Sequence, residues 1–221
     1  MNTLALLYVD EFKGFTKSRV MLALWVGLPL LALVLHVWSP AVDGDMPVSA
    51  FTALIVSSIS GTLASAMLAV SIIHERSRHV YELFLIRPMQ RRDILLAKFL
   101  AVYTGLTIAA VLAIVVGFAV DYVDHGTIPP ALWTDTLKSL GMSLSMTAIA
   151  SAAGVLIGVI TTSVLLGVIL VVYGANQIAA IAVLPAILDF STNSLLTFAG
   201  AAVIATVMIA VAVLLFNRQQ F

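Results

Sequence analysis

Long apolar runs separated by short polar stretches make up most of this sequence. At about 20 apolar residues per crossing helix, they predict membrane spans at about residues 20–38, 48–73, 97–120, 136–160, 164–184 and 195–216. The run over residues 136–185 contains one charge, Lys138. A single helix of that length would measure about 75 Å against a hydrocarbon core of about 30 Å. We therefore place a tight turn at residues 161–163, where two threonines and a serine interrupt the run, and predict six spans.

The N-terminal stretch has apolar and charged positions on different sides of a helix. Its apolar members at helical spacing are Leu4, Leu7, Tyr8, Phe12 and Phe15, and Asp10, Lys13 and Lys17 fall toward the other side. Because helices of this kind lie in the membrane interface, residues 1–19 are predicted to form an interfacial amphipathic helix on the cytoplasmic surface. The alternative is an ordinary polar segment leading into the first span.

Basic residues are distributed unevenly in the predicted topology. With both termini in the cytoplasm, the inner side holds Lys13, Lys17, Arg19, Arg76, Arg78, Arg87, Arg91, Arg92, Lys98 and Arg218. Only Lys138 is left outside, together with Asp43, Asp45, Asp121, Asp124, Asp135 and Asp189. Since the excess of Lys and Arg marks the cytoplasmic side, we predict a multi-pass protein of the cytoplasmic membrane with both ends inside.

The composition supports a membrane location. Hydrophobic residues make up 62% of the chain, charged residues 10%, and the mean hydropathy is +1.12, whereas about 25% of residues are charged in an average soluble domain. The predicted fold is an all-α integral membrane protein with a single transmembrane domain over residues 1–221. With no net charge and no cysteine, the sequence gives no sign of a nucleic-acid partner, a disulfide or a thiol ligand.

Two rows of small residues predict close helix packing. Ser57, Gly61 and Ser65 form one row in the second span, and Gly154 and Gly158 form a GxxxG pair in the fourth. Small side chains at four-residue spacing let a neighbouring backbone approach. We expect both rows to lie at helix contacts.

Signatures of membrane enzymes are absent from the sequence. The segment HERSRH at residues 74–79 resembles HExxH, but its histidines are five residues apart and about 140° apart around a helix, so they do not share a face. The sequence holds no GxxxxGK[ST] phosphate loop, which excludes this common ATP site. We predict no catalytic, cofactor or metal site. Ionisable side chains are almost absent from the spans, which argues against a carrier coupled to ion movement.

One polar group interrupts the fifth span. Tyr173, Asn176 and Gln177 lie within VVYGANQIAA. Hydrogen bonding between helices is one interpretation, and contact with a substrate on its path is the other.

The polar stretch over residues 74–98 carries a family resemblance. An acidic residue ends the second span, followed by an E-L pair, a proline, a basic pair and an I-L-x-x-K start to the third span: Glu75, Glu82, Leu83, Pro88, Arg91, Arg92, Ile94, Leu95 and Lys98. Near the N-terminus, Glu11, Lys13, Gly14 and Arg19 fit the amphipathic connecting helix of the same family. The chain resembles the permeases of type-2 ATP-binding-cassette (ABC) exporters.

The resemblance implies a division of labour between subunits. ATP and Mg²⁺ would bind two copies of a separate ABC-type ATPase, and this chain would pair with a second copy of itself or a related permease in membrane lipid. A cytoplasmic coupling helix over residues 78–86 would dock the ATPase. The residues implied in coupling are Glu75, Arg78, Tyr81, Glu82, Leu83, Phe84, Pro88 and Arg91. The alternative is that this stretch only sets the topology by its positive charge.

Two other functions stay open at this point. A haem-exporter permease of cytochrome c maturation resembles the chain in length and in the same loop. A membrane scaffold or assembly protein without transport activity is the alternative from another class, and the scarcity of charge in the spans is compatible with it.

Overall fold

Helices make up almost all of the described chain. The computed structural model describes residues 3–38, 48–78, 90–125, 130–175, 177–180 and 194–218. The elements are α1 (Thr3–Thr16), α2 (Arg19–Trp38), α3 (Val48–Ser77), α5 (Arg91–His125), α6 (Pro130–Ile160), α7 (Val164–Leu170), the π-helix η1 (Val171–Ala175) and α9 (Ser194–Arg218). No strand occurs in this part of the chain, in agreement with the predicted all-α class.

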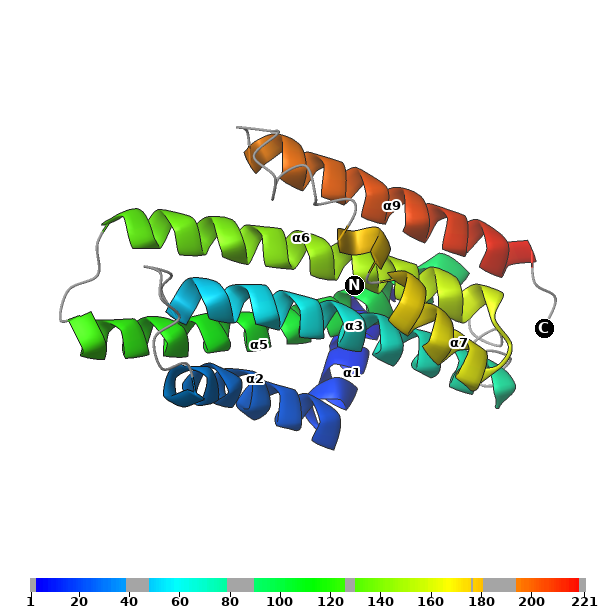
Figure 1. The fold of residues 1–221 in the computed structure, drawn as a ribbon. Helices are drawn as coiled ribbons and strands as arrows, with labels where there is room; N and C mark the ends of the chain where they lie inside the picture. The colour runs from blue at the N-terminus through cyan, green and yellow to red at the C-terminus, as the bar shows by residue number, and fades with distance from the viewer. Residues whose placement is uncertain are drawn as a thin grey trace.

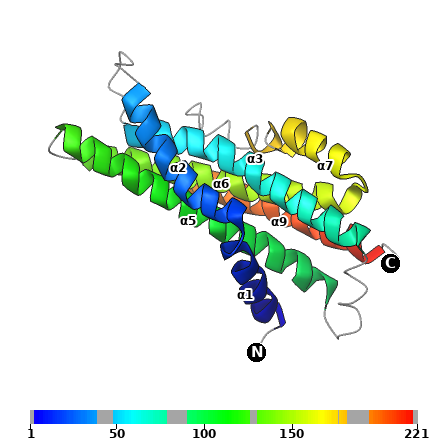
Figure 2. The same cartoon turned by 90° about the horizontal axis from the view of Figure 1, so that it is seen from below.

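The long helices lie roughly alongside one another, with α3, α5 and α6 between the others (Figure 1). Helix α2 packs on α5, α9 packs on α6, and α7 packs on α3. In the apolar window of α6, 67% of residues are buried, compared with 17% in α9. Helix α6 is therefore central, and α9 leaves most of its apolar surface for lipid or a partner. Helix α1 runs across this direction and contacts α5, as the view from below shows (Figure 2).

Fewer than six of the described helices are long and apolar enough to count as membrane spans. Four helical stretches are long and apolar enough to cross a bilayer: Ser58–Ser77, Arg91–Val123, Thr136–Ile160 and Phe198–Arg218. Helices α1 and α2 meet at a bend of 69° and pass the same test only as a pair, which would give a fifth span. The stretch Val164–Ala180 is a shorter apolar helix. Six spans therefore stay a prediction.

The predicted turn in the long apolar run coincides with a helix break. Helix α6 ends at Ile160 and α7 begins at Val164. The Ile157 carbonyl in the last turn of α6 accepts from the Thr161 backbone N–H at 2.9 Å and from the Thr161 hydroxyl at 2.5 Å. That both helices cross the bilayer remains a prediction.

The GxxxG pair predicted in the fourth span packs against α3, and Ser65 of the other predicted row lies in this contact. A Cβ atom on Gly154 would meet the backbone of Ser65 at 2.5 Å, and one on Gly158 would meet the Ala69 backbone at 3.1 Å. The backbones of α3 and α6 are therefore in direct contact, because Gly154 and Gly158 of α6 carry no side chain. The Ser65 hydroxyl donates to the Gly61 carbonyl of its own helix at 2.9 Å, so the contact contains no unpaired hydroxyl there.

Substituting Gly154 tests this contact. Gly154→Ala is expected to lower the stability by about 1–3 kcal/mol, because a backbone cannot rotate away from the added methyl group as a side chain can. The measurement is the temperature at which the purified protein loses its monodisperse size-exclusion peak in detergent.

Gly200→Ala is the matched control, because a Cβ atom there meets nothing within 4 Å. It should preserve the midpoint or raise it slightly, since alanine favours helix over glycine. Equal effects of the two substitutions would contradict the contact.

Candidate functional site

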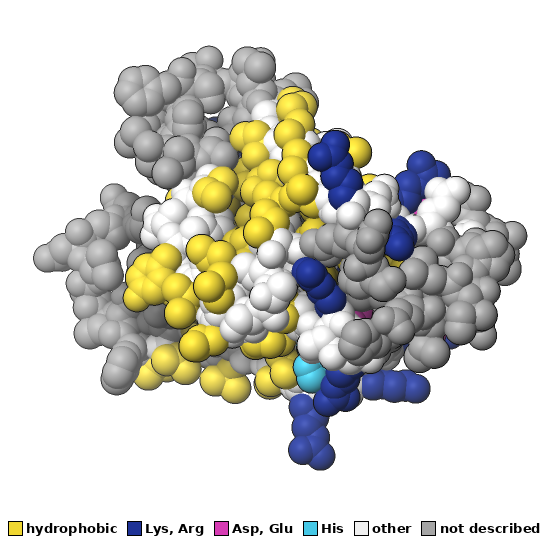
Figure 3. All heavy atoms as spheres, turned by 90° about the vertical axis from the view of Figure 1, so that its right-hand side faces the viewer, with side chains coloured by type: hydrophobic (Ala, Val, Ile, Leu, Met, Phe, Trp, Pro, Cys, Tyr) yellow, Lys and Arg dark blue, Asp and Glu magenta, His cyan; other side chains and the backbone are white. Residues whose placement is uncertain are grey.

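Basic side chains gather at one end of the helix bundle, which we call the basic end. At the ends of α3, α5 and α9 its members are Arg76, Arg78, Arg91, Arg92 and Arg218. On α1, which Glu11 joins to Lys98 of α5, and at the start of α2, its members are Lys13, Lys17 and Arg19. Figure 3 looks onto this end and shows several of these side chains at the surface. Lys138 lies near the opposite end, in the early turns of α6. The described charges therefore have the asymmetry that the sequence predicts.

Two arginines join the helices that meet at the basic end. Arg76 in the last turn of α3 donates from Nη1 to the Val159 carbonyl of α6 at 3.0 Å. Arg91 at the start of α5 donates from Nη1 to the Phe216 carbonyl of α9 at 3.2 Å. Both carbonyls lie in the last turn of a helix, where no intrahelical donor follows and the helix dipole favours a cation. The two contacts fix α3 to α6 and α5 to α9.

The central feature of this end is a cluster of three charges, which we call the ion cluster. The Lys98 ammonium donates to Glu11 Oε1 at 2.7 Å and to Glu75 Oε1 at 2.6 Å. The Lys98 side chain is 2% exposed, and the carboxylates are 26% and 23% exposed. One cation therefore serves two anions from two other helices, and the formal charge of the cluster is −1.

Each charge reaches the cluster from a different helix. Glu11 comes from α1, Glu75 from the last turn of α3 and Lys98 from the early part of α5. On α1, Leu7 and Phe15 lie four residues to either side of Glu11 and pack against the apolar core. This spacing places all three on the face toward α5. Tyr8 adds a hydrogen bond from Oη to Thr104 Oγ1 of α5 at 3.2 Å.

Glu75 is only partly satisfied. Its Oε1 accepts from Lys98 and also from the Ser71 hydroxyl at 3.2 Å. Its Oε2 is buried and has no hydrogen-bond partner among the described residues. Since a buried carboxylate oxygen without a donor is costly, Glu75 depends strongly on Lys98.

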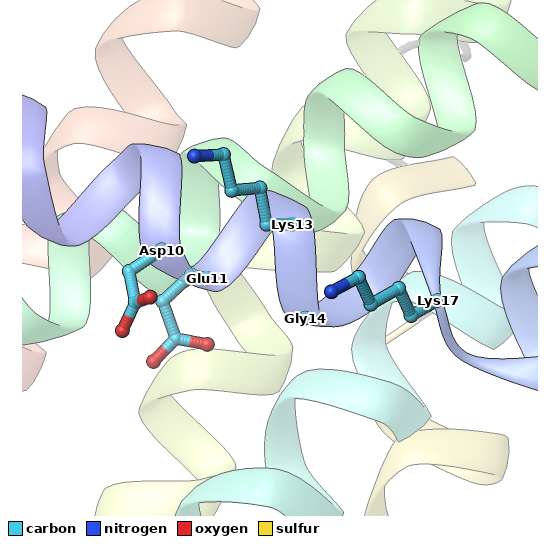
Figure 4. A pocket seen from close by; sticks show the side chains of 5 residues that line it. All are labelled: Asp10, Glu11, Lys13, Gly14 and Lys17. Carbon is cyan, nitrogen blue, oxygen red and sulfur yellow. The ribbon is translucent and has the colours of Figure 1, made fainter.

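The ion cluster is surrounded by apolar side chains and opens to one side. Leu68 and Ile72 of α3, Leu95 and Val102 of α5 and Val159 of α6 belong to the buried core beside it. A groove of about 430 Å³ along α1 is lined, within the described chain, by Asp10, Glu11, Lys13, Gly14 and Lys17 (Figure 4). In that view the two carboxylates lie together and the Lys13 ammonium points away from them. Glu11 therefore connects the buried Lys98 to an open, charged groove.

The structure describes only some of the predicted coupling residues, and their role in coupling stays a prediction. Glu75, Arg78 and Arg91 are described and all lie at the basic end. Arg78 is exposed just after α3, where its backbone N–H donates to the His74 carbonyl at 3.1 Å. The others, Tyr81, Glu82, Leu83, Phe84 and Pro88, lie outside the described residues, so the coupling helix remains a prediction.

The predicted substrate-path residues are not at the basic end. Tyr173 lies in η1 and Gln177 in the helical residues that follow, and both side chains are exposed. Asn176 lies outside the described residues. No hydrogen bond between helices involves these two side chains within the described part of the chain, and both interpretations of the group stay predictions.

The sequence analysis identifies all three charged residues of the ion cluster, but it does not predict that they form ion pairs with one another. Glu11, Glu75 and Lys98 each fit the family pattern, yet they were expected in separate elements. One signal was available, because a lysine at the edge of an apolar span normally needs a carboxylate partner. Within the described chain, no group of three His, Cys, Asp or Glu side chains is arranged to hold a metal ion.

Removing Lys98 tests the ion cluster. Lys98→Met is expected to lower the stability by about 3–5 kcal/mol, because two partly buried carboxylates lose their cation. The triple variant Lys98→Met, Glu11→Gln, Glu75→Gln should recover much of the loss, since it leaves no uncompensated charge. Thermal midpoints in detergent provide the comparison.

Arg92→Met is the control for the ion cluster. Arg92, whose side chain is 62% exposed, pairs with the adjacent Asp93 at 3.5 Å, and ion pairs at the surface contribute about 0–1 kcal/mol. A Lys98→Met protein as stable as Arg92→Met would show that the cluster does not hold the helices together.

Comparison with known proteins identifies the family. A comparison with curated sequences found no match. The family model described as ABC-2 family transporter protein matches residues 44–217. This range includes α3 to α9, and so the Glu75 and Lys98 parts of the ion cluster. Because the match extends over most of the sequence, the chain belongs to the ABC-2 transporter family and is the membrane permease component of an ABC transporter.

Proposed function

We propose that this chain is the permease of an ABC exporter, moving a substrate across the cytoplasmic membrane with ATP hydrolysed by a separate subunit. Two ATPase copies would dock at the basic end of a permease pair, formed by two copies of this chain or by this chain and a related one. The chain would cross the membrane six times with both termini in the cytoplasm. The family assignment supports the permease role.

The charge distribution supports the orientation. The described Lys and Arg residues other than Lys138 lie at the basic end or in the ion cluster close to it. Since positive charge is retained on the cytoplasmic side, the basic end faces the cytoplasm. Helix α3 ends and α5 begins at that end, and the proposal is that a cytosolic ATPase docks there on the segment that joins them.

The ion cluster is the observation that carries the coupling proposal. Glu75 lies four residues before the segment 79–89, and its partner Lys98 lies nine residues after it. A force on this segment acts on the last turn of α3 and the first turns of α5, which Lys98 holds together. Through Glu11 the same lysine passes the displacement to α1. The ATPase therefore acts on three helices through one contact.

Alternating access to the two sides, driven by closure of the ATPase dimer, is the simplest transport cycle for this arrangement. The arginine contacts to Val159 and Phe216 extend the connection to α6 and α9. The bundle then responds as a unit, since rigid helices joined by hydrogen bonds move together more readily than they deform.

Co-purification tests the docking segment. The parent protein is expected to co-purify with a P-loop ATPase. Leu83→Asp or Glu82→Lys should abolish this association, because each places an unfavourable charge in the predicted contact. Immunoblotting of the tagged permease eluate gives the measurement.

Asp45→Lys provides the matched control. It reverses a charge in the loop predicted to face the other side of the membrane, and it should retain the ATPase. Reconstituted vesicles that transport without any ATPase would overturn the proposal. Vesicles containing both subunits whose ATP hydrolysis drives no movement would favour a scaffold instead.

A further inference from the structure

The exposed face of α1 carries charges that the ion cluster does not use. Asp10, Lys13 and Lys17 are exposed, and their side chains form no hydrogen bond or ion pair among the described residues. Lys13 and Lys17 are four residues apart, a spacing at which two like charges on a helix repel each other. By contrast, Glu11 on the neighbouring side of α1 is held by Lys98.

The groove along α1 separates these charges by sign. In Figure 4 the carboxylates of Asp10 and Glu11 lie together, and we call them the carboxylate end. Lys13 and Lys17 line the groove further along the helix and form the lysine end, with the Lys17 ammonium pointing toward Gly14. A Cβ atom on Gly14 would meet nothing within 4 Å in the described chain, so the space beside it is open. The groove therefore fits a group that carries one charge of each sign.

Helix α1 crosses α5 where the apolar run of α5 begins. Residues 99–120 contain no charged side chain, and Lys98, directly before them, contacts Glu11. Thr104, within the first turns of the run, contacts Tyr8. Helix α5 is long and apolar enough to cross a bilayer, and charged side chains flank the apolar part of a span rather than enter it. A bilayer around this run would have its lipid headgroups at the level of α1.

Apolar side chains share the exposed face with the lysine end. Leu6 is 51% exposed and Val9 is 46% exposed. They precede Lys13 by seven and four residues, so all three lie on one side of the helix. Exposed apolar side chains beside a charged groove match the two parts of a phospholipid, which are its acyl chains and its headgroup.

We infer that this groove binds the headgroup of a phospholipid with a primary ammonium, of the phosphatidylethanolamine class. The ammonium donates to the carboxylate end, and the phosphate accepts from the lysine end. The acyl chains contact Leu6 and Val9. The phosphate also neutralises the two lysines, whose mutual repulsion no described side chain relieves.

The charges of the groove favour this headgroup over others. A headgroup with only a negative charge would be repelled by the carboxylate end. A choline headgroup carries both charges, but its quaternary nitrogen has no N–H, whereas a primary ammonium has three donors. Four bonds join the ammonium nitrogen to the phosphorus, a span on the order of 5 Å. The two ends of the groove are about 3–10 Å apart along the helix axis, so one headgroup can contact both.

Competition for a photoactivatable lipid tests the site. Phosphatidylethanolamine with a diazirine on one acyl chain would be added to the purified protein in detergent, irradiated, and mapped by mass spectrometry to residues 1–19. Unlabelled phosphatidylethanolamine is expected to suppress this cross-link. Phosphatidylcholine and phosphatidylglycerol should each require at least about tenfold higher concentrations, because neither can form charge-assisted hydrogen bonds at both ends of the groove.

A soluble headgroup distinguishes a lipid from a free phosphate ester. Glycerophosphoethanolamine has the same charges and no acyl chain, so it should compete at least about tenfold more weakly than the lipid, since the buried acyl carbons contribute to affinity. Equal competition by the two would overturn the lipid assignment.

Substitutions in the groove assign the contacts. Removing both lysines by Lys13→Gln and Lys17→Gln should weaken competition by phosphatidylethanolamine about tenfold, because the phosphate loses its cations. Asp10→Asn should reduce the preference over phosphatidylcholine. Gly14→Leu should abolish the preference by filling the groove, and the open space around this residue accommodates the larger side chain. Each protein should keep the thermal midpoint of the parent, which separates loss of binding from loss of folding.

Two controls match these substitutions. Gly27→Leu introduces the same side chain on α2, where a Cβ atom also meets nothing within 4 Å. Combining Arg92→Gln with Lys138→Gln removes two exposed positive charges outside the groove. Both proteins should retain the parent's preference for phosphatidylethanolamine.

Three results would overturn the inference. Equal competition by all three phospholipids would leave only unspecific contact between α1 and lipid. Stronger competition by phosphatidylglycerol would exclude recognition of the ammonium. An equal loss in the control without Arg92 and Lys138 would assign the effect to overall positive charge. No ATPase takes part in these measurements, so their failure is distinguishable from failure of the co-purification.

Discussion

The Lys98 ammonium is an ion that the bundle has to neutralise, and the arrangement of three helices depends on how it does so. With the side chain 2% exposed, water cannot solvate the charge, and a lone buried cation would be strongly destabilising. Glu11 and Glu75 supply the counter-charges from α1 and α3. Their positions leave little freedom in how those helices meet α5, since both oxygens must lie within hydrogen-bond distance of one nitrogen atom.

Around this polar point, the contact between α3 and α6 depends on the absence of side chains. Gly154 and Gly158 bring α6 against the Ser65 and Ala69 backbone, so dispersion contacts are gained where the hydrophobic effect gives no advantage over lipid. Several hydroxyls of these two helices donate within their own helix, as Ser151 does to the Thr147 carbonyl at 2.6 Å, while the buried Thr52 and Ser143 hydroxyls have no hydrogen-bond partner among the described residues. The bundle therefore combines one cluster of strong ion pairs, at Lys98, with a close-packed contact between α3 and α6 that contains no ion pair among the described residues.

The predictable parts of the structure were those encoded locally. The break between α6 and α7 follows from length and from the polar residues 161–163, and the helix ends agree with it. The rows of small residues predicted helix contact, but only the structure shows that Ser65 and Gly154 face each other. The ion cluster and η1 were not predictable in the same way. Pairing between residues 87 positions apart, as in Glu11 and Lys98, depends on tertiary arrangement, and a π-helix differs from an α-helix by one residue in a turn.

The separation in sequence between Glu11 and Lys98 has a consequence for how the protein is made. Helix α1 is synthesised before α3 and α5, none of its residues is fully buried, and it finds its ionic partner only after the chain has been extended to α5. Glu75 and Lys98, 23 positions apart, come together within one pair of neighbouring segments. During membrane insertion, the N-terminal helix thus remains without its Lys98 contact until the α3–α5 pair has been synthesised, and its docking marks the completion of that half of the bundle.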